Sequence, residues 1–388
     1  MRDQRGRIYL DYHATTPVDP RVADVVARHM LVSFGNAGSA DHVFGDEAAA
    51  AVDAATASVG ALVGGRAVDV LFTSGATESI NMVLKGLAAR AGGRRLRIAA
   101  SPTEHSAVLH TCEALVRAGI AEVTWLRVDG HGHVDMNEIE QVFGRGCDVV
   151  CVMAANNEIG TIAPFARVAA LAQQHGVAYL CDASQAGGRV LLESLGALDA
   201  FVVLSAHKMY GPRGVGALVS SRLKALGPLI HGGEQQRGLR GGTLNVPGIA
   251  GFGEAARLRR EEMGTDESRV AQLRDDLQGR LLAGIPHIAV NGDPLSRLAG
   301  NLHVSVTGIP NGAVVARVRD RLAIATGAAC ASGIEAPSHV LRAIGLEGPH
   351  LDGALRIGLG RWTTSGDVEE ASALLIVAVR AIAQLLTR

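Results

Sequence analysis

Residues 201–212 read FVVLSAHKMYGP. The apolar run Phe201 to Leu204 predicts a buried strand, so Lys208 lies just beyond that strand's carboxyl end. The hydroxyl of Ser205 and the imidazole of His207 precede the lysine. A lysine in this setting suits a Schiff base with an aldehyde cofactor such as pyridoxal phosphate, whose phosphate the neighbouring donors would hold. The alternative is an ordinary solvated lysine in a loop.

Outward from this segment, short apolar runs alternate with amphipathic ones. The apolar runs cover residues 70–73, 97–100, 149–154, 178–181, 201–204 and 216–219, and the amphipathic ones cover 78–89, 106–118 and 167–175. Strands that alternate with helices predict an α/β fold with a mostly parallel sheet, covered on both faces. Near Gly251 the pattern changes to long charged segments. There we predict helices over 254–263, 267–283 and 313–321 with strands over 288–290 and 301–306, which indicates a smaller C-terminal α+β domain.

Polar residues follow several of the predicted strands. Residues 74–78, SGATE, separate a strand from a helix, and their backbone N–H groups with the Thr77 hydroxyl suit a phosphate monoester. Asp182 ends another run, where a carboxylate can pair with a pyridinium nitrogen. His105 and Asn156 occupy the same kind of position. The alternatives are a capped helix start at Thr77, a helix cap at Asp182, a loop histidine and a turn-forming asparagine.

Bulk properties exclude some classes of function. The 388 residues carry a net charge of −1, which gives no electrostatic case for binding nucleic acid or a membrane surface. Residues 1–7 are polar and lack the apolar core of an export signal, so we expect a cytoplasmic protein. The five cysteines are an odd number, which argues against a disulfide framework. Cys147 and Cys151 have no second pair to complete a zinc site, and no metal is expected.

Taken together, these motifs resemble those of cysteine desulfurases of the NifS/IscS type, in the class V aminotransferase family. The resemblance covers nearly the whole chain. It is carried by Tyr9–Tyr12, Ala14–Pro17, Gly35-Asn36 through His42, Phe44-Gly45, Thr73–Ser79, Glu104-His105, Asn156–Gly160, Asp182 with Gln185, Ser205–Pro212, Arg240–Leu244, Gly360-Arg361 and Thr363-Thr364. It implies the type I fold of aminotransferases that depend on pyridoxal phosphate. The large cofactor-binding domain would cover residues 16–258, and residues 1–15 and 259–388 would form the small domain.

The resemblance also implies a role for each candidate residue. Lys208 would hold the cofactor and move the Cα proton of the substrate, while His105 would stack on the ring. Asp182 would pair with the pyridine nitrogen and Gln185 with the ring hydroxyl. The phosphate would lie among Ala76, Thr77, Ser205 and His207, joined by Thr243 from the other subunit of a homodimer. L-Cysteine would meet Asn36, Asn156 and Arg356, and Asn156 would also contact the cofactor.

Arg356 lies in the apolar run LRIGLG, and its guanidinium suits bidentate binding of a carboxylate. The alternative, an ordinary surface arginine, fits poorly in so apolar a run. Cys330 lies among small residues in TGAACASG, where a loop can move and leave the sulfur uncovered. The resemblance makes its thiolate the group that takes sulfur from L-cysteine and leaves L-alanine. An inert loop thiol is the alternative.

Three functions are compatible with the chain: a desulfurase, a lyase of the same fold acting on cysteine or selenocysteine, and a catalytically idle sulfur-relay subunit. Intact Lys208, Asp182 and Cys330 count against the idle subunit. The persulfide would pass to a protein acceptor, for iron–sulfur cluster assembly or for thiolation of tRNA, a cofactor or DNA. Because the sequence ends at Arg388 without the tail of housekeeping relatives, we expect a dedicated acceptor. Gly327 and Gly333 are the expected hinges of the Cys330 loop.

Overall fold

A computed structural model describes residues 1–326 and 338–387 of the chain. Its centre is a seven-stranded sheet with the strand order β2-β8-β7-β6-β5-β3-β4. All neighbouring strands from β7 to β4 pair in parallel, whereas β8 is antiparallel to both β7 and β2. The predicted mostly parallel sheet is therefore confirmed. The strands are β2 Val70–Thr73, β3 Leu96–Ala100, β4 Ala121–Trp125, β5 Val149–Cys151, β6 Ala178–Asp182, β7 Phe201–Ser205 and β8 Gly216–Val219.

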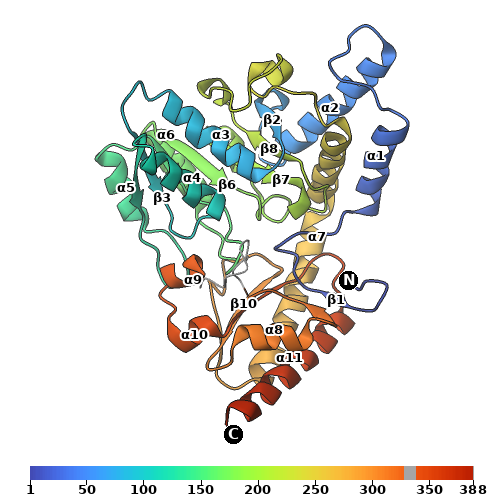
Figure 1. Ribbon diagram of the computed structural model, residues 1–388, viewed down its shortest axis with the longest axis vertical. Helices are drawn as coiled ribbons and strands as arrows, with labels where there is room; N and C mark the ends of the chain where they lie inside the picture. Colours follow the sequence, from blue (N-terminus) through green and yellow to red (C-terminus); the bar gives the residue numbers. More distant parts are fainter. Residues whose placement is uncertain (327–337, 388) are drawn as a thin grey trace.

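Helices cover both faces of this sheet because successive strand residues point to opposite sides. In β7, Phe201 and Val203 join a core with α3 and α4, while Val202 and Leu204 join the core on the other face. That second core holds α2, α5 and α6 (Figure 1). The helices are α2 Val43–Ala61, α3 Ala76–Ala89, α4 Ser106–Arg117, α5 Met136–Gly144 and α6 Phe165–Gln174.

One long helix, α7 (Val246–Gly284), joins the sheet to the rest of the chain. The prediction of two separate helices over 254–263 and 267–283 is wrong, because α7 continues through Gly264. A glycine inside a helix costs only about 1 kcal/mol, and packing at both ends of α7 offsets that cost. Its first half packs against α1 (Pro20–Leu31) and α2, and its second half contributes Val270, Leu277 and Leu281 to a separate core.

The C-terminal third forms a smaller α+β unit around that separate core. Its three-stranded sheet is antiparallel, in the order β12-β10-β9, and β1 pairs with β11 beside it. Ile8 and Leu10 from the N-terminal segment pack into this core. The predicted boundaries at 15/16 and 258/259 stay a prediction. The elements are β1 Ile8–Tyr9, β9 Ile288–Val290, β10 Asn301–Val306, β11 Leu322–Ala323, β12 Ala354–Gly358, α8 Asn311–Val318, α9 His339–Ala343, α10 Gly348–Asp352 and α11 Ser365–Leu386.

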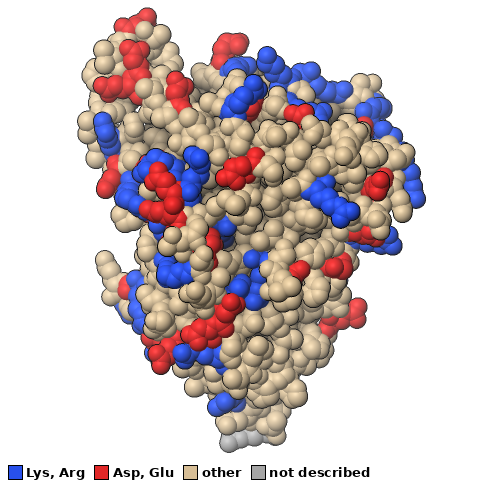
Figure 2. Space-filling view, turned by 180° about the vertical axis from the view of Figure 1, so that it is seen from behind, with Lys and Arg blue, Asp and Glu red and all other residues tan. Residues whose placement is uncertain are grey.

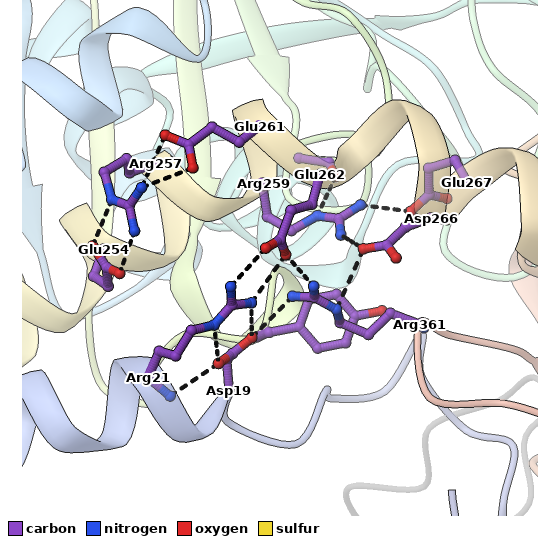
Figure 3. Close-up of polar contacts among 12 residues, drawn as sticks. Asp19, Arg21, Glu254, Arg257, Arg259, Glu261, Glu262, Asp266, Glu267 and Arg361 are labelled. Atoms are coloured by element: carbon purple, nitrogen blue, oxygen red, sulfur yellow. Dashed lines mark hydrogen bonds and ion pairs between the residues drawn. The ribbon is translucent and has the colours of Figure 1, made fainter.

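Ion pairs tie α1, α7 and the segment after β12 together (Figure 3). Arg361 pairs with Asp19 at 3.0 Å and also with Glu262. Arg21 contacts the same two carboxylates, at 2.8 Å and 2.6 Å. One turn earlier in α7, the buried Arg259 pairs with Asp266 at 2.5 Å. The network holds the smaller unit against the large one at the junction.

The surface carries charges of both signs. Figure 2 shows Lys and Arg interspersed with Asp and Glu over the face it presents, in agreement with a net charge near zero. Within residues 1–326 and 338–387, no helix combines the length and the apolar character that crossing a bilayer requires.

Candidate active site

A cavity of about 600 Å³ opens where the carboxyl ends of β5, β6 and β7 meet the start of α3. Residues of the N-terminal segment and of β12 complete its wall. Because parallel strands end at one edge of a sheet, side chains far apart in the sequence converge there. The predicted residues that line it are Ala76, Thr77, His105, Asp182, Gln185, Ser205, His207, Lys208 and Arg356.

Lys208 ends a short 3-10 helix, Ala206–Lys208, that follows β7 directly. Its Nζ donates to the backbone oxygens of His13 at 2.6 Å and Ala14 at 2.9 Å. Burial, reinforced by the Arg189 and Arg356 guanidinium groups, lowers the pKa of Lys208 to about 8. The amine therefore loses its proton more readily than a solvated lysine, as a nucleophilic amine requires.

The wall around the start of α3 suits an anion. Gly75 precedes the helix with φ +155°, and no side chain caps the helix N-terminus. The first backbone N–H groups of α3 therefore lie at the cavity beside the Thr77 hydroxyl. Ser205 and His207 line the same cavity, with His207 Nδ1 3.0 Å from Thr15 Oγ1. Burial and then the Lys208 ammonium lower the pKa of His207 to about 4, so its ring is neutral at pH 7.

Asp182 and His105 also line the cavity. The buried Asp182 carboxylate ends β6, and its Oδ1 accepts the Ser184 N–H at 2.9 Å. His105 Nδ1 accepts the Ala107 N–H at 3.1 Å, which places the proton of the neutral ring on Nε2. Desolvation lowers the pKa of His105, although the nearby Asp182 opposes this shift. The two side chains thus offer a carboxylate and a neutral imidazole to one ligand.

Arg356 projects from β12 and is only 6% exposed. Its Nη2 pairs with Asp11 at 2.9 Å, and its Nη1 donates to the Asn157 oxygen at 3.2 Å. Its Nε is buried and has no hydrogen-bond partner among the residues that the structure describes. A guanidinium held in the cavity wall by these two contacts suits a carboxylate ligand. Sequence reasoning missed Asp11, although this residue lies within the quoted segment Tyr9–Tyr12.

Asn156, Asn36 and Thr243 were predicted to belong to the site but do not line the cavity. Asn156 is buried beside the wall, which Ala155 and Asn157 line instead. Its Oδ1 accepts the N–H groups of Glu158 and Ile159 at 2.8 Å and 3.0 Å, and its Nδ2 donates to the Thr103 oxygen at 3.0 Å. Asn156 therefore forms the turn of its alternative interpretation, and its contact with substrate or cofactor stays a prediction.

Asn36 and Thr243 are exposed and do not line the cavity. Asn36 Oδ1 accepts the Gly38 N–H at 3.0 Å within its own loop. Thr243 lies three residues after Arg240, whose Nε pairs with Glu78 on α3 at 3.0 Å. Cys330 lies outside the described residues. The single chain therefore brings neither Asn36 nor Thr243 into the cavity wall.

Sequence reasoning also missed His13 and Arg213, which line the cavity. His13 is adjacent to the quoted segment Ala14–Pro17, and Arg213 follows the quoted segment Ser205–Pro212. Nothing in their spacing distinguished them from ordinary loop residues. Their place in the wall depends on how the N-terminal segment folds back over the strand ends.

The donor set fits pyridoxal phosphate. The cavity offers an amine for the aldehyde at Lys208, a helix N-terminus with hydroxyl groups for the phosphate, and the Asp182 carboxylate for a ring nitrogen. His105 supplies a flat side chain in the same wall.

Comparison with known proteins agrees with this arrangement. The family model Aminotransferase class-V matches residues 8–371. The cysteine desulfurase IscS of Anaeromyxobacter sp. (strain Fw109-5) is 40% identical over 380 residues, which cover 97% of this chain and 94% of that protein. A NifS-like protein of known structure superposes with a TM-score of 0.88 at 32% identity, covering 97% of this chain and 99% of that one. The structure of SspA in complex with cysteine gives a TM-score of 0.81 at 30% identity, covering 92% and 100%.

Proposed function

The chain belongs to the class V aminotransferase family and, within it, to the cysteine desulfurases, and from this membership we propose how its residues carry out the reaction. In this proposal pyridoxal phosphate is the cofactor, L-cysteine is the substrate, and the products are L-alanine and a persulfide on Cys330. The observation that carries the proposal is the convergence of an amine with a lowered pKa, a carboxylate and an uncapped helix N-terminus on one cavity.

Different residues of the cavity wall bind the phosphate, the ring nitrogen and the aldehyde carbon of the cofactor in this proposal. Thr77, Ser205 and His207 hold the phosphate together with the N–H groups that begin α3. Asp182 keeps a proton on the ring nitrogen, and the bound cofactor then supplies a sink for the negative charge left on the substrate carbon. Lys208 holds the cofactor through Nζ and, once released, moves the Cα proton.

Arg356 binds the substrate carboxylate through the N–H groups that Asp11 and Asn157 leave free. His105, neutral and protonated on Nε2, packs against the ring and donates a hydrogen bond or relays a proton there.

The assignment of Cys330 rests on the family resemblance and on the small residues around it in the sequence. Its thiolate attacks the sulfur of the bound substrate. The Cβ–S bond breaks with its electron pair going to carbon, and proton transfer to that carbon completes L-alanine. The persulfide then passes to an acceptor protein by direct contact.

Product analysis tests the function. Purified protein loaded with pyridoxal phosphate is incubated with L-cysteine and dithiothreitol, and alanine, pyruvate and sulfide are measured. We expect alanine and sulfide in equal amounts from the wild type. Pyruvate with sulfide would indicate a lyase, and no turnover would indicate an idle subunit.

We also propose that the working enzyme is a homodimer. The end of α1, the connection to α2 and the start of α2 expose several large apolar side chains, which is unusual for a surface that faces water. They are Met30, Leu31, Val32, Phe34, Val43 and Phe44. Asn36 lies in the same connection, and Thr243 is exposed next to a loop anchored on α3. A second copy would cover the apolar side chains and bring Thr243 to the partner's phosphate site.

Sedimentation velocity tests the homodimer. The wild type should sediment as a dimer, whereas Phe34→Glu combined with Phe44→Glu should give monomers that bind pyridoxal phosphate weakly. Monomers that bind the cofactor and turn over like the wild type would refute the composite site.

A further inference from the structure

Strand β2 lies at one edge of the central sheet, so one row of its backbone groups faces away from β8. Gln236 binds two of these groups. Its Oε1 accepts the Phe72 N–H at 2.6 Å, and its Nε2 donates to the Phe72 oxygen at 2.8 Å. Arg237 extends this contact, since its guanidinium donates to the Val70 oxygen at 3.0 Å and, just before β2, to the Val68 oxygen at 2.5 Å. The two side chains thus clamp their loop onto the edge of the sheet.

The backbone at this clamp has an uncommon conformation. Gln236 and Arg237 have φ values of +49° and +64°, in the left-handed region that residues other than glycine disfavour. Residues in such a conformation persist where the surrounding contacts hold them. Here those contacts are the four hydrogen bonds to residues 68–72. Without these bonds the two residues can return to an ordinary backbone conformation, which would redirect the loop that follows.

The clamp is tied to the far end of the same loop. Gln235, directly before the clamp, accepts the Gly242 N–H on its Oε1 at 3.1 Å. Gly242 precedes Thr243, which is exposed. Arg240 is a second anchor, since its Nε pairs with Glu78 on α3 at 3.0 Å. Two anchors, the clamp and Arg240, therefore set the place of Thr243 on the surface.

We propose that Gln236 and Arg237 are positioning residues that act between subunits: they hold Thr243 of their own chain where its hydroxyl meets the cofactor phosphate bound in the other chain. The inference rests on the homodimer and the cofactor of the proposed function and deepens them, because the family resemblance assigns Thr243 alone. A hydroxyl that is already held in place loses less conformational entropy when it binds a phosphate than one on a free loop. The described wall of the chain's own cavity contains no residue of the loop 231–243. Loss of the clamp should therefore weaken cofactor binding in the opposite subunit.

Mixed dimers separate an effect on the opposite subunit from damage within the altered one. The clamp variant carries Gln236→Ala and Arg237→Ala, which removes all four hydrogen bonds to residues 68–72. Lys208→Ala marks a subunit whose cavity should give no visible absorbance, so that the absorbance of a mixed dimer reports on the other cavity alone. Dimers with two different affinity tags are purified, and the dissociation constant of pyridoxal phosphate is measured from this absorbance.

Two pairings are compared with a wild-type subunit paired with Lys208→Ala. In the first, the clamp variant and Lys208→Ala are on the same chain, so the reporting cavity is wild type but receives Thr243 from a loop without its clamp. Its dissociation constant should rise about tenfold, the lower end of what a hydrogen bond to a charged group contributes. In the second, they are on different chains, so the reporting cavity receives Thr243 from an intact loop and should bind normally. Arg269→Ala removes a guanidinium that likewise binds two backbone oxygens, of Arg361 and Thr363, and should have no effect in either pairing.

Equal weakening in both pairings, or weakening in the second alone, would overturn the inference, because the clamp would then act within its own subunit. Normal binding in both pairings would overturn it as well. A wild type that is monomeric or binds no pyridoxal phosphate would instead overturn the proposed function on which the inference rests. Should the double variant not fold, Gln236→Met decides in the same two pairings, because it keeps a side chain of similar size and removes only the two bonds to Phe72.

Discussion

Arg356→Lys tests how the cavity recognises the substrate carboxylate. In the wild type, Asp11 and the Asn157 oxygen each bind one terminal nitrogen of the guanidinium, and each of these nitrogens carries a second N–H. Lysine keeps the positive charge but has one nitrogen in place of three. It cannot pair with Asp11, satisfy Asn157 and present a fork to the substrate at the same time.

The magnitude follows from the contacts that are lost. A hydrogen bond to a charged group contributes about 1.5–3 kcal/mol, and lysine retains part of the Coulomb attraction. We therefore expect a loss of about 2–3 kcal/mol in binding the carboxylate, which is a factor of about 30 to 150 in kcat/KM for L-cysteine. Most of the effect should appear in KM, because the carboxylate is bound both before and during the reaction.

The assay compares L-cysteine with cysteamine, which lacks the carboxylate, by measuring sulfide release. The variant should lose activity towards L-cysteine and keep whatever activity the wild type has towards cysteamine. Arg321→Lys, at an exposed arginine that pairs with Glu370, is the matched control and should behave like the wild type. An Arg356→Lys enzyme that favours L-cysteine over cysteamine as strongly as the wild type does would refute the assignment.

Three further outcomes are expected. Lys208→Ala should abolish the visible absorbance of the bound cofactor, and an unchanged spectrum would exclude this lysine as its attachment point. Because the pKa of Lys208 is lowered to about 8, the rate at which the cofactor-free enzyme binds added pyridoxal phosphate covalently should rise with pH and level off above about 8. A rate that does not change with pH from about one unit below to about one unit above this pKa would contradict the prediction. Arg361→Leu should lower the free energy of unfolding by about 2 kcal/mol; the loss is limited because Arg21 still neutralises Asp19 and Glu262. Arg257→Leu, at an exposed pair, should lower the free energy of unfolding by less than about 1 kcal/mol. Equal melting temperatures of the two variants would count against the network.

The part of the site that follows the strands could be predicted from the sequence. Asp182, Ser205 and Lys208 come at or just after apolar runs, and the carboxyl ends of parallel strands share one edge of a sheet. Their convergence therefore required no knowledge of loop conformation. Thr77 follows the same rule at the start of α3.

The remaining residues depend on tertiary contacts that local patterns do not encode. Asn156 also follows a strand, but its amide is consumed by the turn that it stabilises. His13 lies in the cavity only because the N-terminal segment crosses over Lys208 and Gln185. The continuity of α7 was missed because the helical pattern around Gly264 is weak, while packing against two different cores keeps the helix intact.

Transfer of sulfur to Cys330 is the central claim, and a single-turnover measurement tests it most directly. The holoenzyme is mixed with one equivalent of L-cysteine without reductant, and the peptide that contains Cys330 is analysed by mass spectrometry while alanine is quantified. We predict one additional sulfur atom on Cys330 and one alanine per active site in the wild type. Cys330→Ser and Lys208→Ala should give neither product. Alanine formed by Cys330→Ser at the wild-type rate, or a wild-type peptide without added sulfur, would contradict the mechanism.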